Sequence, residues 1–244
     1  MNEVQGAIAA AVVCAVAGYL APLLVRRLPE PPEKPEEEQS AAERAEGPKE
    51  TYAAIAALPW FAPTAMVVSG VAGGLVGWTL GWSWVLLVVV PVVPVAVLLS
   101  VVDLRTRLLP AVVVWPTFLY ALAAVVLHGL LVATGHDLQR AAIALVVGYL
   151  FYFVLWFVHP SGLGFGDVRL SAVLALVLGY LGWPQFIVGM YAGFLLLGLP
   201  GLLLAVAKRR ASYLKVQLPF GPFMAAGALL GIVLGPQLLG LAAR

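Results

Sequence analysis

Two aspartates border the apolar stretches of this 244-residue sequence. Of its twelve acidic residues, nine lie before residue 51, and Asp137 is expected in an outside loop, which leaves Asp103 and Asp167. An ionisable group next to lipid is costly and is therefore a candidate functional residue. Two carboxylates held a few ångströms apart share a proton, so one can act as general base on a water while the other protonates a carbonyl oxygen. The pair therefore predicts hydrolysis that needs no metal, no cofactor and no nucleophilic side chain.

Local ion pairs are the alternative interpretation of these two aspartates. Asp103 is close in sequence to Arg105 and Arg107, and Asp167 is close to Arg169. Charge patterning alone does not distinguish two structural ion pairs from a catalytic pair.

Glycines precede the second aspartate on alternate positions, in the run Gly162-Leu163-Gly164-Phe165-Gly166-Asp167-Val168-Arg169-Leu170. Glycine permits backbone angles that other residues avoid and allows another backbone to come close. The run is therefore expected to admit an extended substrate next to the acid, although a hinge would have the same composition. A phosphate-binding loop is not favoured, because no strand precedes the glycines.

Three motifs in this order resemble those of type IV prepilin peptidases, which are membrane aspartic peptidases of the GxGD type. The first is an aspartate a few residues before a proline, as in Asp103-Leu104-Arg105-Thr106-Arg107-Leu108-Leu109-Pro110. The second is Gly164-Phe165-Gly166-Asp167, followed by Arg169 where the family usually has Lys. The third is Pro219-Phe220-Gly221-Pro222, before the last apolar stretch. The resemblance covers about residues 84–240.

The resemblance implies the roles of particular residues. The aspartates of the family are catalytic, and we expect this role for Asp103 and Asp167. The candidates for binding or positioning the substrate are Gly164, Gly166, Arg169, Pro219 and Gly221. The implied substrate is a prepilin-like precursor with a single membrane span, cut after a glycine between its basic leader and its apolar segment.

The chain departs from many members of that family between its first two apolar stretches. Those members carry a cysteine-rich, zinc-binding loop there that is associated with methylation of the new N-terminus. The only cysteine of this chain is Cys14, and residues 28–50 are rich in Pro and Glu. Such a composition favours a solvated linker. We therefore expect a peptidase that does not methylate and that binds no metal and no cofactor.

Most of the chain must lie in lipid, because 62% of its residues are hydrophobic and only 11% are charged. Soluble domains have about 25% charged residues. Eight apolar stretches approach the length of roughly 20 residues that spans a bilayer, and their backbones must be helical there. They lie at 6–25, 60–80, 84–102, 111–133, 141–158, 167–182, 185–206 and 221–242. Pro91 and Pro94 are expected to bend the third helix.

The distribution of basic residues predicts that the N-terminus lies outside. Glu3 precedes the first stretch, and Arg26 and Arg27 follow it, which is the reverse of a signal peptide, so we expect an uncleaved helix. With this orientation, twelve of the fourteen Lys and Arg residues fall in inside loops, as the positive-inside rule requires. They are Arg26, Arg27, Lys34, Arg44, Lys49, Arg105, Arg107, Arg169, Lys208, Arg209, Arg210 and Lys215. Both aspartates then lie at the cytoplasmic face.

The sequence thus predicts an all-α, multi-pass protein of the prokaryotic plasma membrane. We divide it into a first transmembrane helix (1–27), a Pro/Glu-rich cytoplasmic linker (28–58) and a membrane-embedded peptidase core (59–244). Its expected partners are the lipid bilayer and the precursor, and a net charge of +2 does not suggest nucleic acid. A proton-coupled transporter that uses the two aspartates as a relay is the second hypothesis, although such sites usually lie near the midplane. A scaffold without catalysis is the third.

Overall fold

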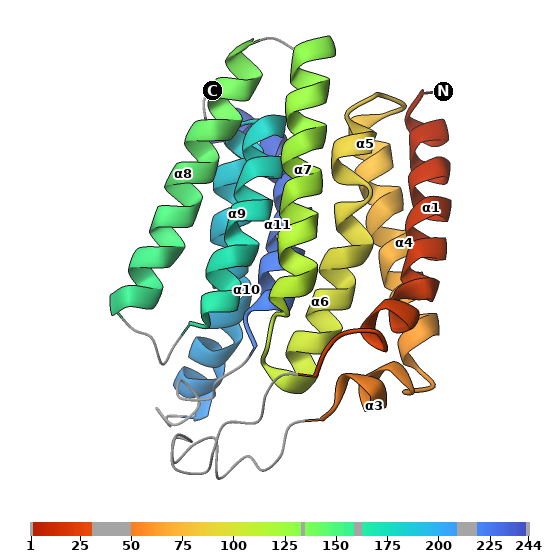
Figure 1. The fold of residues 1–244 in the computed structure, drawn as a ribbon. Helices are drawn as coiled ribbons and strands as arrows, with labels where there is room; N and C mark the ends of the chain where they lie inside the picture. The colour runs from red at the N-terminus through yellow and green to blue at the C-terminus, as the bar shows by residue number, and fades with distance from the viewer. Residues whose placement is uncertain (1, 31–49, 133–134, 159–162, 209–218, 243–244) are drawn as a thin grey trace.

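The computed structural model describes residues 2–30, 50–132, 135–158, 163–208 and 219–242. Helices make up nearly all of this part of the chain, and none of it forms a strand (Figure 1). The helices are α1 (Asn2–Val25), α3 (Tyr52–Ala56), α4 (Phe61–Leu80), α5 (Leu86–Val89), α6 (Val92–Thr106), α7 (Ala111–Leu131), α8 (Gly135–Val158), α9 (Phe165–Leu181), α10 (Trp183–Lys208) and α11 (Gly221–Ala242). The predicted all-α class is therefore confirmed.

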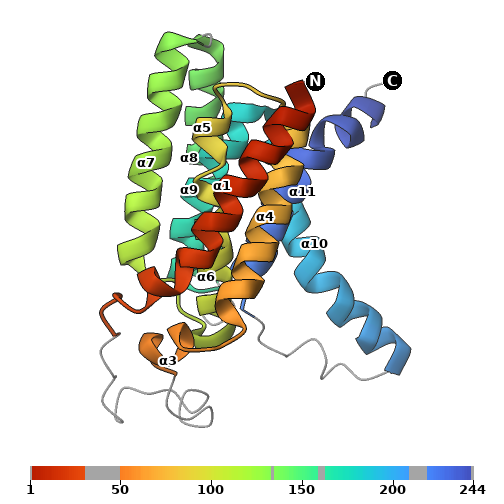
Figure 2. The ribbon, with the colours of Figure 1, turned by 90° about the vertical axis from the view of Figure 1, so that its right-hand side faces the viewer.

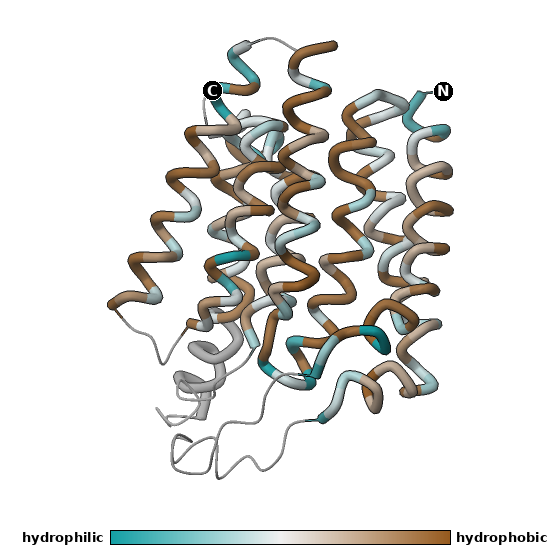
Figure 3. Tube along the Cα trace, viewed as in Figure 1, coloured by the Kyte–Doolittle hydropathy of each residue, from teal (hydrophilic) through white to brown (hydrophobic). Residues whose placement is uncertain are grey.

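Six helical segments of the described chain are long and apolar enough to cross a membrane. They are α1, α4, the α5–α6 segment Leu86–Thr106, α7, α8 and the Gly221–Gly240 part of α11. Helix α9 has 17 residues, in agreement with the short sixth stretch of the sequence. The segment Trp183–Gly198 of α10 is apolar but shorter than a full span. Figure 3 shows hydrophobic residues along most of each long helix, so the chain is a polytopic membrane protein.

The third apolar stretch is broken at a proline. Helix α5 ends at Val89 and α6 begins at Val92, with Pro91 as the residue before the new helix. Proline has no N–H to donate and its ring disfavours a continuous helix. The predicted bend is therefore present as an interruption, while Pro94 lies within α6.

Small residues let α1 and α4 pack backbone to backbone. The side of α1 that faces α4 carries Gly6, Ala10, Cys14 and Gly18, all buried and spaced by four residues. A Cβ on Gly6 would lie 2.6 Å from the carbonyl oxygen of Gly77 in α4. Such small-residue faces are typical of helix pairs in membranes, where close approach increases van der Waals contact.

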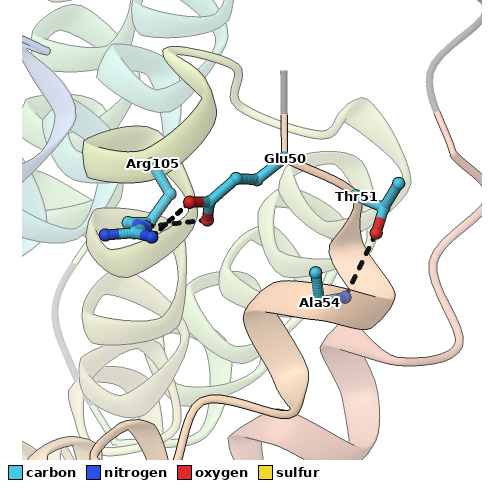
Figure 4. Close-up of polar contacts among 4 residues, drawn as sticks. All are labelled: Glu50, Thr51, Ala54 and Arg105. Carbon is cyan, nitrogen blue, oxygen red and sulfur yellow. Dashed lines mark hydrogen bonds and ion pairs between the residues drawn. The ribbon is translucent and has the colours of Figure 1, made fainter. Parts of the chain in front are cut away.

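The short helix α3 lies below α4 and α6 in Figures 1 and 2, within the segment predicted as a linker. Thr51 is its N-cap and accepts a hydrogen bond of 3.2 Å from the Ala54 N–H (Figure 4). Glu30 accepts hydrogen bonds from the N–H groups of Tyr52 (2.9 Å) and Ala53 (3.1 Å). These contacts satisfy the first free donors of the helix. The last residues of the predicted linker are therefore ordered, and residues 31–49 lie outside the described chain.

Helix α3 is also tied to the end of α6 by an ion pair. Figure 4 shows Glu50 and Arg105 facing each other through two hydrogen bonds, and the one to Arg105 Nε measures 2.9 Å. Both side chains are more than one-third exposed. Such a surface pair contributes about 0–1 kcal/mol, so it orients α3 more than it stabilises the fold.

Candidate active site

Asp103 lies in the last turn of α6, with only 4% of its surface exposed. Its Oδ2 accepts a hydrogen bond of 2.9 Å from the backbone N–H of Gly221, the first residue of α11. The helix ends at Thr106. The C-cap residue Arg107 has the left-handed backbone angle φ 54° and donates its N–H to the Asp103 carbonyl oxygen at 2.8 Å. The carboxylate is thus held between the end of one helix and the start of another.

The turn after Asp103 connects the first aspartate to the second. The Thr106 hydroxyl donates to the Val102 carbonyl at 2.8 Å and accepts from the Leu108 N–H at 3.2 Å. Leu109 is buried against Gly166, where an added Cβ would lie 2.8 Å from the Leu109 Cβ. A glycine is therefore needed at position 166 for the turn to pack against the first turn of α9.

Asp167 lies in the first turn of α9 and is 7% exposed. Its Oδ2 accepts a hydrogen bond of 3.0 Å from the N–H of Gly164, the N-cap residue, and its own N–H donates to the Gly164 carbonyl at 3.0 Å. The other carboxylate oxygen, Oδ1, is buried and has no hydrogen-bond partner. A buried polar atom without a partner is costly, and such atoms mark places where a substrate, a proton or a water belongs.

The two aspartates meet at one end of the helix bundle. The lower end of α6 and the lower ends of α9 and α11 converge in Figure 1. Asp103 and Asp167 lie close enough to interact electrostatically. The structure therefore brings together the two acids that the sequence singled out.

The neighbouring arginines only partly follow the ion-pair interpretation. Arg105 pairs with Glu50 rather than with Asp103. The guanidinium carbon of Arg169 lies 4.7 Å from the centre of the Phe165 ring, a cation–π contact. Arg107 is the arginine that acts electrostatically on Asp103.

The three glycines predicted to position the substrate lie around the two carboxylates. Gly164 and Gly221 each supply the N–H that holds one aspartate, and Gly166 contacts the turn after Asp103. Pro219 is half-buried in the segment that leads into α11. Gly162, the first glycine of the run, lies outside the described residues.

A buried tyrosine that the sequence did not single out completes the site. Tyr152 of α8 is 1% exposed and lies close enough to Asp167 to interact electrostatically. Its ring stacks on Phe220 at 6.0 Å and packs against Phe194 at 5.3 Å between ring centres. Since Phe220 immediately precedes Gly221, Tyr152 packs beside the segment that holds Asp103 and also lies near Asp167. Within an aromatic apolar stretch, no local pattern distinguishes this tyrosine from its neighbours.

No group of three or more His, Cys, Asp or Glu side chains in the described ranges is arranged to hold a metal ion. Cys14 of α1, the one cysteine of the sequence, is fully buried against Gly73 of α4.

The fold and the site define a polytopic helical membrane protein with two buried carboxylates at one end of its bundle. Residues 90–206 match the model of the type IV leader peptidase family. A protein of Burkholderia pseudomallei (strain K96243) is 34% identical over 134 residues, which are 53% of this chain and 40% of that protein. One from Dickeya chrysanthemi is 29% identical over 191 residues, 73% of this chain and 61% of that protein. Both relatives are named prepilin leader peptidase/N-methyltransferase.

The resemblance to type IV prepilin peptidases is therefore confirmed, over a segment that contains both aspartates. The alignments cover from 40% to 61% of these two relatives. No solved structure matches the chain significantly.

Proposed function

We propose that this chain is an intramembrane aspartic endopeptidase that removes the leader from prepilin-like precursors at the cytoplasmic face of the plasma membrane. One observation carries the proposal: two buried carboxylates lie together, and each is held at Oδ2 by the backbone N–H of a motif glycine. A positioned pair of this kind is the arrangement that general acid–base hydrolysis requires. The family match and the names of the relatives support the same function.

The reaction follows from the shared proton. The ionised carboxylate of the pair takes a proton from water, and the resulting hydroxide adds to the carbonyl carbon of the scissile bond. The protonated carboxyl gives its proton to the carbonyl oxygen. When the tetrahedral species collapses, the C–N bond breaks and the leaving amine takes the proton that the first carboxylate accepted from water. The carboxylate that had protonated the carbonyl oxygen takes a proton back as the carbonyl re-forms, so the pair returns to its starting state. Asp103 and Asp167 carry these two roles, and their fixed Oδ2 atoms orient the remaining oxygens.

The other motif residues have supporting roles in this proposal. Gly164 and Gly221 position the carboxylates, Gly166 lets the two loops approach, and Arg169 and Pro219 border the substrate. The methyl transfer named for the relatives is not proposed here, because residues 28–50 contain no cysteine.

Proton relay in a transporter is the second hypothesis. Asp103 lies in the last turn of α6 and Asp167 in the first turn of α9, so both lie near helix ends rather than in the middle of the bundle. This position favours a reaction at the membrane face over transport.

A cleavage assay distinguishes the hypotheses. The purified chain in lipid vesicles would receive a model precursor that has a short basic leader, a junction glycine and an apolar segment of about 20 residues. A product cut after the glycine would support the peptidase. The absence of product, at an enzyme concentration equal to the substrate concentration, would contradict the proposal. The transporter and the scaffold would then remain as hypotheses.

A further inference from the structure

A membrane-facing groove runs along α6 toward the aspartates. Its volume is about 400 Å³, and its walls come from α4, α5, α6, α9 and α11. Along α6 it extends from Val92 to Leu104, about 18 Å at 1.5 Å per residue. Val68 of α4 is 46% exposed and Ala226 of α11 is exposed, so the groove is open on the lipid side.

The groove runs toward the active site along two helices. Ala96 and Ser100 line it on α6, and Asp103 follows on the same helical face at the i, i+4, i+7 spacing. Leu174 and Leu178 line it on α9, and they lie seven and eleven residues after Asp167, again on one face. The α6 face of the groove therefore ends next to Asp103, at Leu104, and the α9 face begins about two turns from Asp167.

The lining suits the side of an apolar helix. Ala72, Ala96, Ala225 and Ala226 are small, and small residues allow a second helix to come close in a membrane. The Ser100 hydroxyl donates to the Ala96 carbonyl at 2.7 Å, so it presents no unused donor to the groove. The volume accommodates the side chains along one face of a helix rather than a whole helix.

We propose that this groove binds the apolar segment of the precursor and sets which peptide bond reaches Asp103 and Asp167. The inference rests on the proposed function and adds the surface that recognises the substrate. An apolar helix in the groove runs from the aspartate end toward the opposite face of the membrane. Its first residue then lies at the level of the two carboxylates, with the leader beyond them.

Bulky substitutions test the groove. Ala96→Phe and Ala225→Phe fill it, whereas Ala123→Phe places the same ring on an exposed face of α7, outside the groove. The groove variants should lower kcat/KM for the model precursor about tenfold, because the added ring occupies the space of the apolar segment and forces it to shift. They should change cleavage of a short peptide, which has the leader and the junction but no apolar segment, less than about twofold. Ala123→Phe should change neither. Cleavage of the precursor at the wild-type rate by both groove variants would overturn the inference.

Cross-linking tests the same groove without relying on cleavage. In a Cys14→Ala, Asp167→Asn background, a cysteine at Ala226 should cross-link to a thiol-reactive group in the apolar segment of the precursor, and a cysteine at Ala123 should not. Excess unlabelled precursor should suppress the reaction. Cleavage by the wild type without a cross-link at Ala226 would overturn the inference that the groove binds the precursor, and lipid would then be its occupant. The proposed peptidase function would be unaffected. A cross-link without any cleavage would support the groove and contradict the peptidase.

Discussion

The backbone N–H of Gly221 donates a hydrogen bond of 2.9 Å to Oδ2 of Asp103, although 118 positions separate the two residues. The bond joins the end of α6 to the start of α11, and it fixes the first aspartate in the position where it meets the second.

Neutralising either aspartate should abolish cleavage. Asp103→Asn and Asp167→Asn each keep an oxygen that can accept the glycine N–H, so the fold should be retained while the shared proton is lost. We expect the cleavage rate to fall at least about 1,000-fold. The rate is measured on the model precursor, and Asp137→Asn, in the first turn of α8, is the control. Near-normal cleavage by either active-site variant would refute the assignment.

Adding one methyl group beside Asp103 should impair catalysis. In Gly221→Ala the new Cβ would lie 2.8 Å from Asp103 Oδ2, so the carboxylate must shift. A displacement of this kind costs about 10- to 100-fold in rate. Gly240→Ala, in the same helix, is the matched control, because its Cβ would meet nothing within 4 Å. Equal rates for the two variants would show that the reaction does not depend on the close packing of Gly221 against Asp103.

Removing the Tyr152 hydroxyl should slow the reaction without weakening substrate binding. Tyr152→Phe preserves the ring that stacks on Phe220 and removes only the polar group near Asp167. The loss of one hydrogen-bonding group predicts a decrease in kcat of about two- to tenfold with KM unchanged. Tyr149→Phe, in the same helix and stacked on Phe153, should have no effect. A rise in KM alone would indicate a role in binding instead.

Orientation in the membrane can be measured with single cysteines. In a Cys14→Ala background, Ala53→Cys places an exposed thiol on α3, and Gln139→Cys places one near the start of α8, at the opposite end of the bundle (Figure 1). The positive-inside rule predicts that an impermeant reagent labels position 53 from the cytoplasm and position 139 from outside. The reverse pattern would place both aspartates at the outer face.

Cleavage should proceed without methylation and without zinc. A structural zinc site needs about four Cys or His ligands held together. Cys14 is buried in α1, and the three histidines, His128, His136 and His159, are widely separated in the sequence. We expect processing to continue in the presence of a chelator, and the mature N-terminus to stay unmethylated when S-adenosylmethionine is supplied. Mass spectrometry of the product measures both outcomes. A methyl group added by the purified chain would show that the absence of the cysteine-rich loop had been misinterpreted.

The membrane helices and the two aspartates could be predicted from the amino-acid sequence alone. Apolar runs of spanning length must be helical in lipid, because their backbone groups have no other hydrogen-bond partners there. Carboxylates are rare next to such runs, so the order of residues is enough to single out Asp103 and Asp167. The interruption near Pro91 is equally local, because it follows from the missing N–H and the ring of one residue.

The groups that touch these aspartates depend instead on how the helices pack in three dimensions. Arg105 is two residues from Asp103 in sequence, yet it pairs with Glu50. Tyr152 and Gly221 are distant in sequence and lie at the site. The groove along α6 likewise combines residues from five helices. These contacts depend on how each helix is rotated and how closely it approaches its neighbours. Rotation and spacing are set by packing between small and large side chains that are distant in sequence. The order of residues along one helix does not specify this packing.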